Sequence, residues 1–121
     1  MNRAEEVLTD LAQRDSEVHL KRLFGYLAAW SDGRIAALAL AHTVAVRLPA
    51  ADRAEVMGLP GAIPLKLQGR PWRDWVELPA WVLDDPETLS MWLERATDRA
   101  PFLAPDLVDE LPVELEEIFE G

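Results

Sequence analysis

The chain has 121 residues, of which 50% are hydrophobic, and its formal net charge is -10. This length supports a single hydrophobic core, and the apolar content separates the chain from disordered acidic proteins. Because cysteine is absent, disulfides and thiolate metal sites are excluded, which fits a reducing compartment. No stretch approaches the roughly 18 apolar residues of a membrane span, and residues 1–15 lack the apolar run of a signal peptide. These features predict a cytoplasmic protein with no membrane partner.

The acidic residues are concentrated toward the C-terminal end. Seven acids and no base follow position 100: Asp106, Asp109, Glu110, Glu114, Glu116, Glu117 and Glu120. Of the 22 acids in the chain, 15 therefore lie in residues 1–100, together with all 12 bases. The C-terminal segment would repel a polyanion, and the rest would attract it only weakly, which disfavours direct nucleic-acid binding. A protein partner with a basic surface is the better match for this charge.

The N-terminal part of the chain is predicted to form an amphipathic helix over residues 3–20. Its apolar residues fall near one stripe, at Ala4, Val7, Leu8, Leu11 and Val18. Asn2 is a suitable N-cap, because its side-chain oxygen can accept a hydrogen bond from a free backbone N–H of the first turn.

Two further helices have clear start or stop signals. A short helix is predicted over residues 50–57, which Gly58 ends. The last helix begins where Asp85 can cap it and Pro86 suits the first helical position. Its core face is expected to comprise Leu89, Trp92, Leu93, Ala96 and Ala100.

Three segments between these helices are predicted to be extended, at residues 43–48, 63–67 and 72–78. The last segment alternates, which places Trp72, Asp74, Val76 and Leu78 on one face and Arg73, Trp75 and Glu77 on the other. Helices that flank several strands indicate an α+β layer rather than a helical bundle.

The segment RLFGYLAAWSDGRIAALAL, residues 22–40, has two opposed interpretations. Alanine and leucine are strong helix formers, which favours a helix over residues 35–41. Asp32-Gly33, however, joins two apolar runs, and Asp-Gly is a strong two-residue hairpin loop. A glycine inside a helix costs only about 1 kcal/mol relative to alanine, which does not decide the matter. These residues alone leave both structures open.

Three segments in fixed order resemble the TfoX/Sxy N-terminal domain family: RLFGYLAAWSDGRIAALAL, VAVRLPAADRAEV and RPWRDWVELPAWVLDDPETLSMWLERA. The resemblance extends over residues 7–100. It implies a two-layer α+β domain of order α-β-β-β-α-β-β-α with a secretion-chaperone-like shape. Residues 24–30 and 34–41 would then be the strands of an antiparallel hairpin with Asp32-Gly33 at its tip.

The resemblance also implies a role and a domain boundary. Longer members of the family act as regulators of competence genes, so a regulatory or adaptor role is implied. Residues 1–100 form the implied domain, and an acidic amphipathic tail, residues 101–121, stands where longer members have a helix-hairpin-helix domain. The chain departs from the family pattern at Tyr26, where a second glycine is usual, and at residues 41–43, where an Asp-Gly turn is usual.

The residues form no recognisable catalytic or metal-binding motif. The two histidines, His19 and His42, lie on different predicted elements, and a metal site needs three or four converging ligands. The serines lie outside nucleophile-elbow patterns, and residues 58–69 lack the spacing of a phosphate-binding loop. We therefore expect no enzyme activity, no bound metal and no cofactor.

The five tryptophans are more than a core of this size requires. They either cap a small core or form part of a partner-binding patch, since tryptophan and arginine are favoured at interface hot spots. The candidate patch comprises Arg70, Trp72, Arg73 and Trp75. If Trp75 is exposed, Trp75→Ala should weaken self-association or partner binding at little cost in stability.

The tail carries an apolar stripe within its acidic sequence. Leu107, Leu111, Leu115, Ile118 and Phe119 recur at helical spacing, although Pro112 interrupts the series. We expect Leu115, Ile118 and Phe119 to dock on an apolar surface of the same subunit or of a dimer mate.

Two functional hypotheses follow. The first is a regulatory or protein-interaction domain, expected to be a homodimer, whose partner the sequence does not identify. The alternative is a small enzyme or ligand-binding protein with a pocket between the sheet and the helices. An apolar pocket with converging polar groups would favour the alternative, and a flat apolar patch would favour the first hypothesis.

Overall fold

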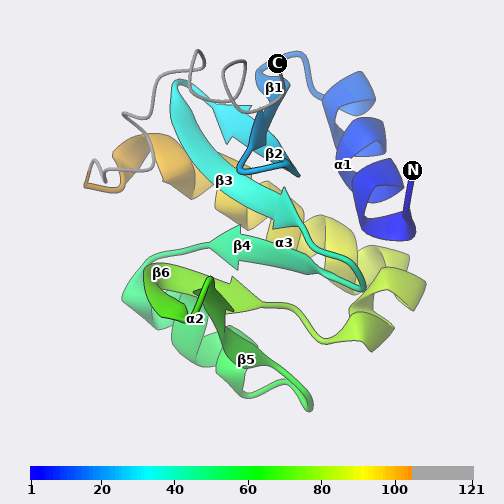
Figure 1. Cartoon of the computed structure of the whole chain (residues 1–121). Helices are drawn as coiled ribbons and strands as arrows, with labels where there is room; N and C mark the ends of the chain where they lie inside the picture. The colour runs from blue at the N-terminus through cyan, green and yellow to red at the C-terminus, as the bar shows by residue number, and fades with distance from the viewer. Residues whose placement is uncertain (105–121) are drawn as a thin grey trace.

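The structure is a computed structural model that describes residues 1–104. In this part of the chain, six antiparallel strands form one sheet in the order β1-β2-β3-β4-β6-β5, with the α-helices against one face (Figure 1). The strands are β1 (Val18–Leu23), β2 (Tyr26–Ser31), β3 (Arg34–Ala39), β4 (Val44–Arg47), β5 (Ile63–Leu67) and β6 (Arg70–Glu77). The helices are α1 (Arg3–Arg14), α2 (Ala50–Met57), α3 (Pro86–Arg99) and the 3-10 helices η1 (Ala80–Asp84) and η2 (Ala100–Phe102). The predicted α+β fold class is confirmed.

Helix α1 begins at the predicted cap but ends well before residue 20. The Asn2 side chain accepts a hydrogen bond from the Glu5 backbone N–H (2.8 Å), and the Glu5 carboxylate accepts one from the Asn2 N–H (3.0 Å). The helix ends at the C-cap Asp15, and β1 then pairs along its whole length with β2. The predicted helix over residues 15–20 is therefore wrong. Val18 is apolar because β1 buries it in the same core as α1, and its spacing from Leu11 imitates a continued helical stripe.

The hairpin implied by the family resemblance is confirmed in β2 and β3. The two strands are antiparallel, and the two-residue loop Asp32-Gly33 joins them. The φ angle is 49° at Asp32 and 76° at Gly33, and a type I′ turn requires positive φ at both positions. The Phe24-Gly25 loop between β1 and β2 also has positive φ at both residues. Tight two-residue loops therefore connect the first three strands.

The alanine-rich sequence of β2 and β3 is explained by burial on both faces of the sheet. Ala29, Ala36 and Ala37 are fully buried in the core that α1 and α3 cover. Ile35 and Leu38 are fully buried on the opposite side. Small side chains at the centre of the sheet let the helices approach it closely, so tertiary packing overrides the helix propensity of alanine.

The segments after the hairpin follow the predicted boundaries closely. Strand β4 lies between β3 and β6, α2 matches the predicted residues 50–57, and β5 matches residues 63–67. Helix α3 begins at the predicted cap, where the Asp85 side chain accepts a hydrogen bond from the Thr88 N–H (3.3 Å). Within residues 1–104, the order contains one strand more than the resemblance implied, because β1 forms an additional edge of the sheet.

Strand β6 does not alternate as predicted, because it is irregular around Asp74. Asp74 has a φ of 75°, and the pairing register of β5 with β6 shifts in the same region, which is the behaviour of a β-bulge. Trp72 and Trp75 consequently pack against the same cluster, whereas Val76 and Leu78 belong to the core under the helices. The prediction that Trp72 shares a face with Val76 is wrong.

Candidate interaction surface

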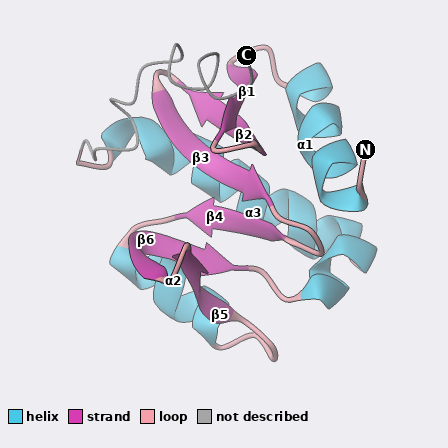
Figure 2. Ribbon diagram, viewed as in Figure 1, coloured by secondary structure: helices cyan, strands magenta, loops and turns pink. Residues whose placement is uncertain are grey.

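One face of the sheet is covered by none of the described helices, and we call it the helix-free face (Figure 2). It is defined by Leu23, Tyr26, Ala28, Trp30, Ile35, Leu38, Leu40, Ala45, Leu65, Leu67, Trp72 and Trp75. The buried apolar residues of α1, α2 and α3 all belong to the separate core on the opposite side. Strand side chains and the β1–β2 loop alone therefore build this face within the described part of the chain.

Aromatic rings run across the helix-free face. The Phe24 and Trp72 rings meet edge to face with their centroids 6.4 Å apart, and Trp72 meets Trp75 in the same way at 5.7 Å. Phe24 belongs to the β1–β2 loop, and β3 and β4 lie between that hairpin and β6 in the sheet. The contact therefore requires the sheet to curve toward this face, as strand twist allows. Phe24 remains 43% exposed, so the row of rings has an accessible end.

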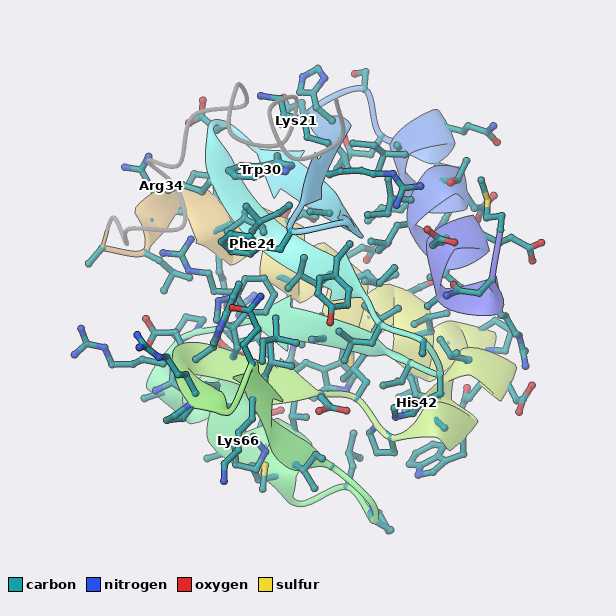
Figure 3. The ribbon with its side chains drawn as sticks, in the orientation of Figure 1. Lys21, Phe24, Trp30, Arg34, His42 and Lys66 are labelled. Atoms are coloured by element: carbon teal, nitrogen blue, oxygen red, sulfur yellow. The ribbon has the colours of Figure 1, made fainter. Side chains whose placement is uncertain are left out.

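Positive charge accompanies these rings. The Lys21 Nζ lies 5.6 Å from the Trp30 ring centroid, within the range of a cation–π contact, and Figure 3 shows both side chains on the side facing the viewer. Arg70 pairs with Leu67 of the helix-free face across β5 and β6. Among the described residues, five cations have no acidic side chain within ion-pair distance: Lys21, Arg34, Lys66, Arg70 and Arg73.

The charges beneath the helices, by contrast, are mutually compensated. The buried Asp52 of α2 meets Arg99 of α3 at 2.9 Å and Arg95 at 3.3 Å. Arg95 also donates a hydrogen bond to the Glu55 carboxylate (2.9 Å), which raises the pKa of Arg95 above its ordinary value. On the other side of the helical layer, Arg22 meets Glu5 of α1. Of the five cations without a described acidic partner, Lys21 and Arg70 therefore lie on the helix-free face.

Arg47 is a fully buried arginine on the helix-free side of β4. It pairs with Trp75 across β4 and β6, and it is 0% exposed. Its Nη1 donates a hydrogen bond to the Ile35 carbonyl (3.3 Å), and its Nη2 donates one to the Ala104 carbonyl (3.0 Å). Sequence reasoning missed this residue. The available signal was a charge beside Val46 in an otherwise apolar strand, since arginine is rarely fully buried without a structural or functional reason.

Glu77 marks the far end of the helix-free face. It pairs with Ala45 of that face, and only 14% of its side chain is exposed. Burial raises the pKa of Glu77 above its ordinary value, while the exposed His42, whose Nε2 lies 3.8 Å from Oε1, acts in the opposite direction. His42 lies in the loop between β3 and β4, apart from Lys21 in Figure 3.

We expect Glu77→Gln to stabilise the protein at neutral pH. A carboxyl with a raised folded-state pKa stabilises the fold below its unfolded pKa and loses that contribution as the pH rises through the folded value. The gain from Glu77→Gln should therefore shrink as the pH falls toward the ordinary glutamate value of 4.5. Urea unfolding of both proteins at several pH values measures this. A variant less stable than wild type at neutral pH would show that His42 compensates the buried charge.

A concave region lies where β1 begins, beside the β2–β3 loop and the end of α3. The hollow has a volume of about 710 Å³, and its lining includes the polar side chains Asp15, Glu17, His19, Asp32 and Asp98. No group of three or more potential metal ligands converges within residues 1–104. The hollow differs from a typical small-molecule pocket, which is mostly apolar with a few converging polar groups.

The structure brings together only part of the predicted partner-binding patch. Trp72 and Trp75 are in contact, and Arg70 is exposed on the same face. Trp75 is only 2% exposed, so the condition under which Trp75→Ala would cost little stability is not met. Arg73 is exposed but lies between the bulge and Trp72 rather than in the cluster.

Other residues complete the surface or lie outside it. Phe24, Lys21 and Trp30 were not selected from the sequence, and the predicted helix over residues 3–20 covered half of the strand that carries Lys21. The predicted docking residues Leu115, Ile118 and Phe119 lie outside the described residues.

The comparisons with known proteins identify one family. The family model described as the TfoX N-terminal domain matches residues 10–100. No curated protein and no solved structure matches the chain. Within residues 1–104, no helix combines the length and apolar character needed to cross a membrane.

Proposed function

The chain belongs to the TfoX N-terminal domain family, and we propose that it is a non-enzymatic, cytoplasmic regulatory or adaptor domain that binds another protein. The helix-free face is the proposed binding surface. The single observation that carries this proposal is the row of aromatic rings, Phe24, Trp72 and Trp75, beside cations that have no described acidic partner.

The chemistry of this face favours an acidic amphipathic partner segment. Tryptophan rings supply contact area, and arginine adds charge-assisted hydrogen bonds at protein interfaces. The net charge of -10 alone predicted a basic partner. The local charge differs, because Lys21 and Arg70 lie on the helix-free face without described acidic partners while the helix-covered side has its own ion pairs. Local complementarity determines which surface a partner selects.

Self-association through the strands is a second mode for the same domain. Strand β5 is an edge of the sheet and Ile63 in it is 50% exposed, and exposed apolar edges invite pairing with another chain. We therefore retain the proposal of a homodimer, which light scattering of the full chain would test directly.

Arg70→Glu tests the proposed surface. The immobilised full chain, its Arg70→Glu variant and a Trp81→Ala control are each exposed to cytoplasmic extract. Trp81 is 42% exposed and donates to the Pro60 carbonyl, away from the helix-free face. We expect one or more proteins to bind wild type and the Trp81→Ala control but not Arg70→Glu, because the substitution reverses a charge without removing packed atoms. Equal capture by all three would reject this face as the partner site.

The alternative function is binding of a small cationic ligand in the 710 Å³ hollow. Its four carboxylates, Asp15, Glu17, Asp32 and Asp98, favour this charge. The lining supplies few apolar side chains to enclose a ligand, so the aromatic face remains the preferred site.

A further inference from the structure

We propose that the acidic tail of the same chain, residues 105–121, docks on the helix-free face and covers it. The docking is argued from the described face and from the tail sequence alone. Its regulatory consequence, competition with a partner, rests on the proposed function. The tail would then be the chain's own acidic amphipathic segment for this surface.

The path of the chain points toward this face. Helix α3 lies on the helix-covered side, but η2 follows it at once and the chain reaches Ala104, whose carbonyl accepts a hydrogen bond from Arg47 (3.0 Å). Arg47 is on the helix-free side of β4, opposite Trp75. The last described residue is therefore held at the margin of the helix-free face rather than under the helices. The 17 residues that follow can extend across a sheet of this size, since an extended chain advances about 3.3 Å per residue.

The charges of the two parts are complementary. The tail carries seven acids and no base, whereas Lys21 and Arg70 of the helix-free face have no acidic partner among residues 1–104. On the helix-covered side, the arginines already meet acids of the domain. An acidic segment therefore gains new charge-assisted contacts on the helix-free face and not beneath the helices.

The apolar residues of the tail give a second, independent match. Leu107, Leu111, Leu115, Ile118 and Phe119 recur at helical spacing in a segment that is otherwise strongly acidic. The face offers half-buried Tyr26, Leu67 and Trp72 together with exposed Phe24. An amphipathic acidic segment can bury its apolar side chains against the aromatic rings while its carboxylates meet the cations at the margin of the face.

The consequence is intramolecular control of access to the face. A docked tail is present at a high effective concentration, so a partner must displace it before binding. Partner binding would then be strengthened by changes that weaken the tail contact, and a partner would require its own apolar and acidic groups. A partner would therefore bind only if its affinity for the face exceeds the effective affinity of the docked tail.

The five tryptophans make the docking measurable in the full chain. Trp30, Trp72 and Trp75 belong to the helix-free face, while Trp92 packs in the core under α3 and Trp81 lies in η1. Each indole N–H gives a separate nitrogen–proton NMR signal. The test variant replaces Leu115, Ile118 and Phe119 with serine, and Val113→Ser, which lies outside the apolar series, is the matched control.

We expect the triple variant to shift the indole signals of the helix-free face and to leave Trp81 and Trp92 in place. Hydrogen exchange of the Trp30 and Trp75 indoles should be about tenfold faster or more, because the cover is lost. The Val113→Ser control should resemble wild type. Five unchanged indole signals in the triple variant would overturn the proposal, and so would equal shifts in all five, which would report general loosening of the fold.

Concentration separates docking within one chain from docking on a second copy. Indole signals of wild type that do not change on dilution support the intramolecular contact, whereas signals that move on dilution to the positions of the triple variant would overturn it in favour of a second copy. The proposed function is tested separately by capture with Arg70→Glu. Loss of the tail contact with partner capture retained would remove the inference and leave the proposed function intact.

Discussion

Replacing Trp75 with alanine is expected to lower the free energy of unfolding by about 3–5 kcal/mol. Trp75 is 2% exposed and packs against Trp72 with ring centroids 5.7 Å apart. The substitution removes the largest side chain type from the helix-free face and leaves a cavity over β4 and β6 on that face, which the paired strands cannot move to fill. Urea denaturation followed by circular dichroism measures the loss without relying on tryptophan fluorescence.

Trp81→Ala is the matched control for this experiment. Trp81 is 42% exposed and its Nε1 donates one hydrogen bond to the Pro60 carbonyl (2.8 Å). Its removal should cost about 1 kcal/mol, the typical contribution of one hydrogen bond. A Trp75→Ala protein as stable as the Trp81→Ala control would show that the helix-free face does not form a packed layer around Trp75.

Replacing Arg47 with methionine is expected to cost about 2–4 kcal/mol. Methionine fills similar space but cannot donate to the Ile35 and Ala104 carbonyls, which accept from Arg47 at 3.3 Å and 3.0 Å. These acceptors remain in place after the substitution, so their desolvation is no longer offset.

Arg73→Met provides the comparison for Arg47. Arg73 is exposed on the same sheet and has no described acidic partner, so the change should stay within about 0.5 kcal/mol of wild type. Equal stability of the two variants in urea denaturation would refute the structural role of Arg47. Arg47→Met would also remove the hydrogen bond that holds the Ala104 carbonyl to β4.

Local chemistry of turns and caps made much of the fold predictable. Asp85-Pro86 is a strong helix start, and this signal acts over a few residues, independently of the rest of the chain. The short helix over residues 50–57 was predictable for the same reason, since a proline and a glycine delimit it. Asp32-Gly33 favours a hairpin loop, but the helix propensity of the alanines and leucines left a helix open, and only the family resemblance favoured the hairpin.

The first strand was not predictable in this way, because its sequence satisfies two structures. Val18 and Leu20 continue the apolar stripe of α1, yet they also alternate with His19 and Lys21 as a strand does. Pairing with β2 decides between them, and that pairing involves residues that lie beyond the window in which helical periodicity is judged. Lys21 therefore escaped attention as part of a surface.

The candidate surface was only half predictable, because one backbone irregularity changes which side chains meet. Strict alternation separates Trp72 from Trp75, whereas the positive φ at Asp74 brings both to one face. Aspartate tolerates this conformation better than most residues do, but no sequence pattern around Asp74 predicts the bulge. Arg47 was missed because burial of a charge depends on carbonyls from distant segments.

The central claim, that the helix-free face is a binding surface occupied by the chain's own tail, has one direct test. The chain has no cysteine, so a single Glu116→Cys substitution allows a nitroxide spin label to be placed in the tail of the full-length protein. The label broadens NMR signals of nearby protons, and the indole signals report on both sides of the sheet. We predict strong broadening at Trp30, Trp72 and Trp75 and none at Trp92, in a sample diluted with unlabelled chain. Broadening of Trp92 alone, or equal intensities with the label oxidised and reduced, would contradict the account.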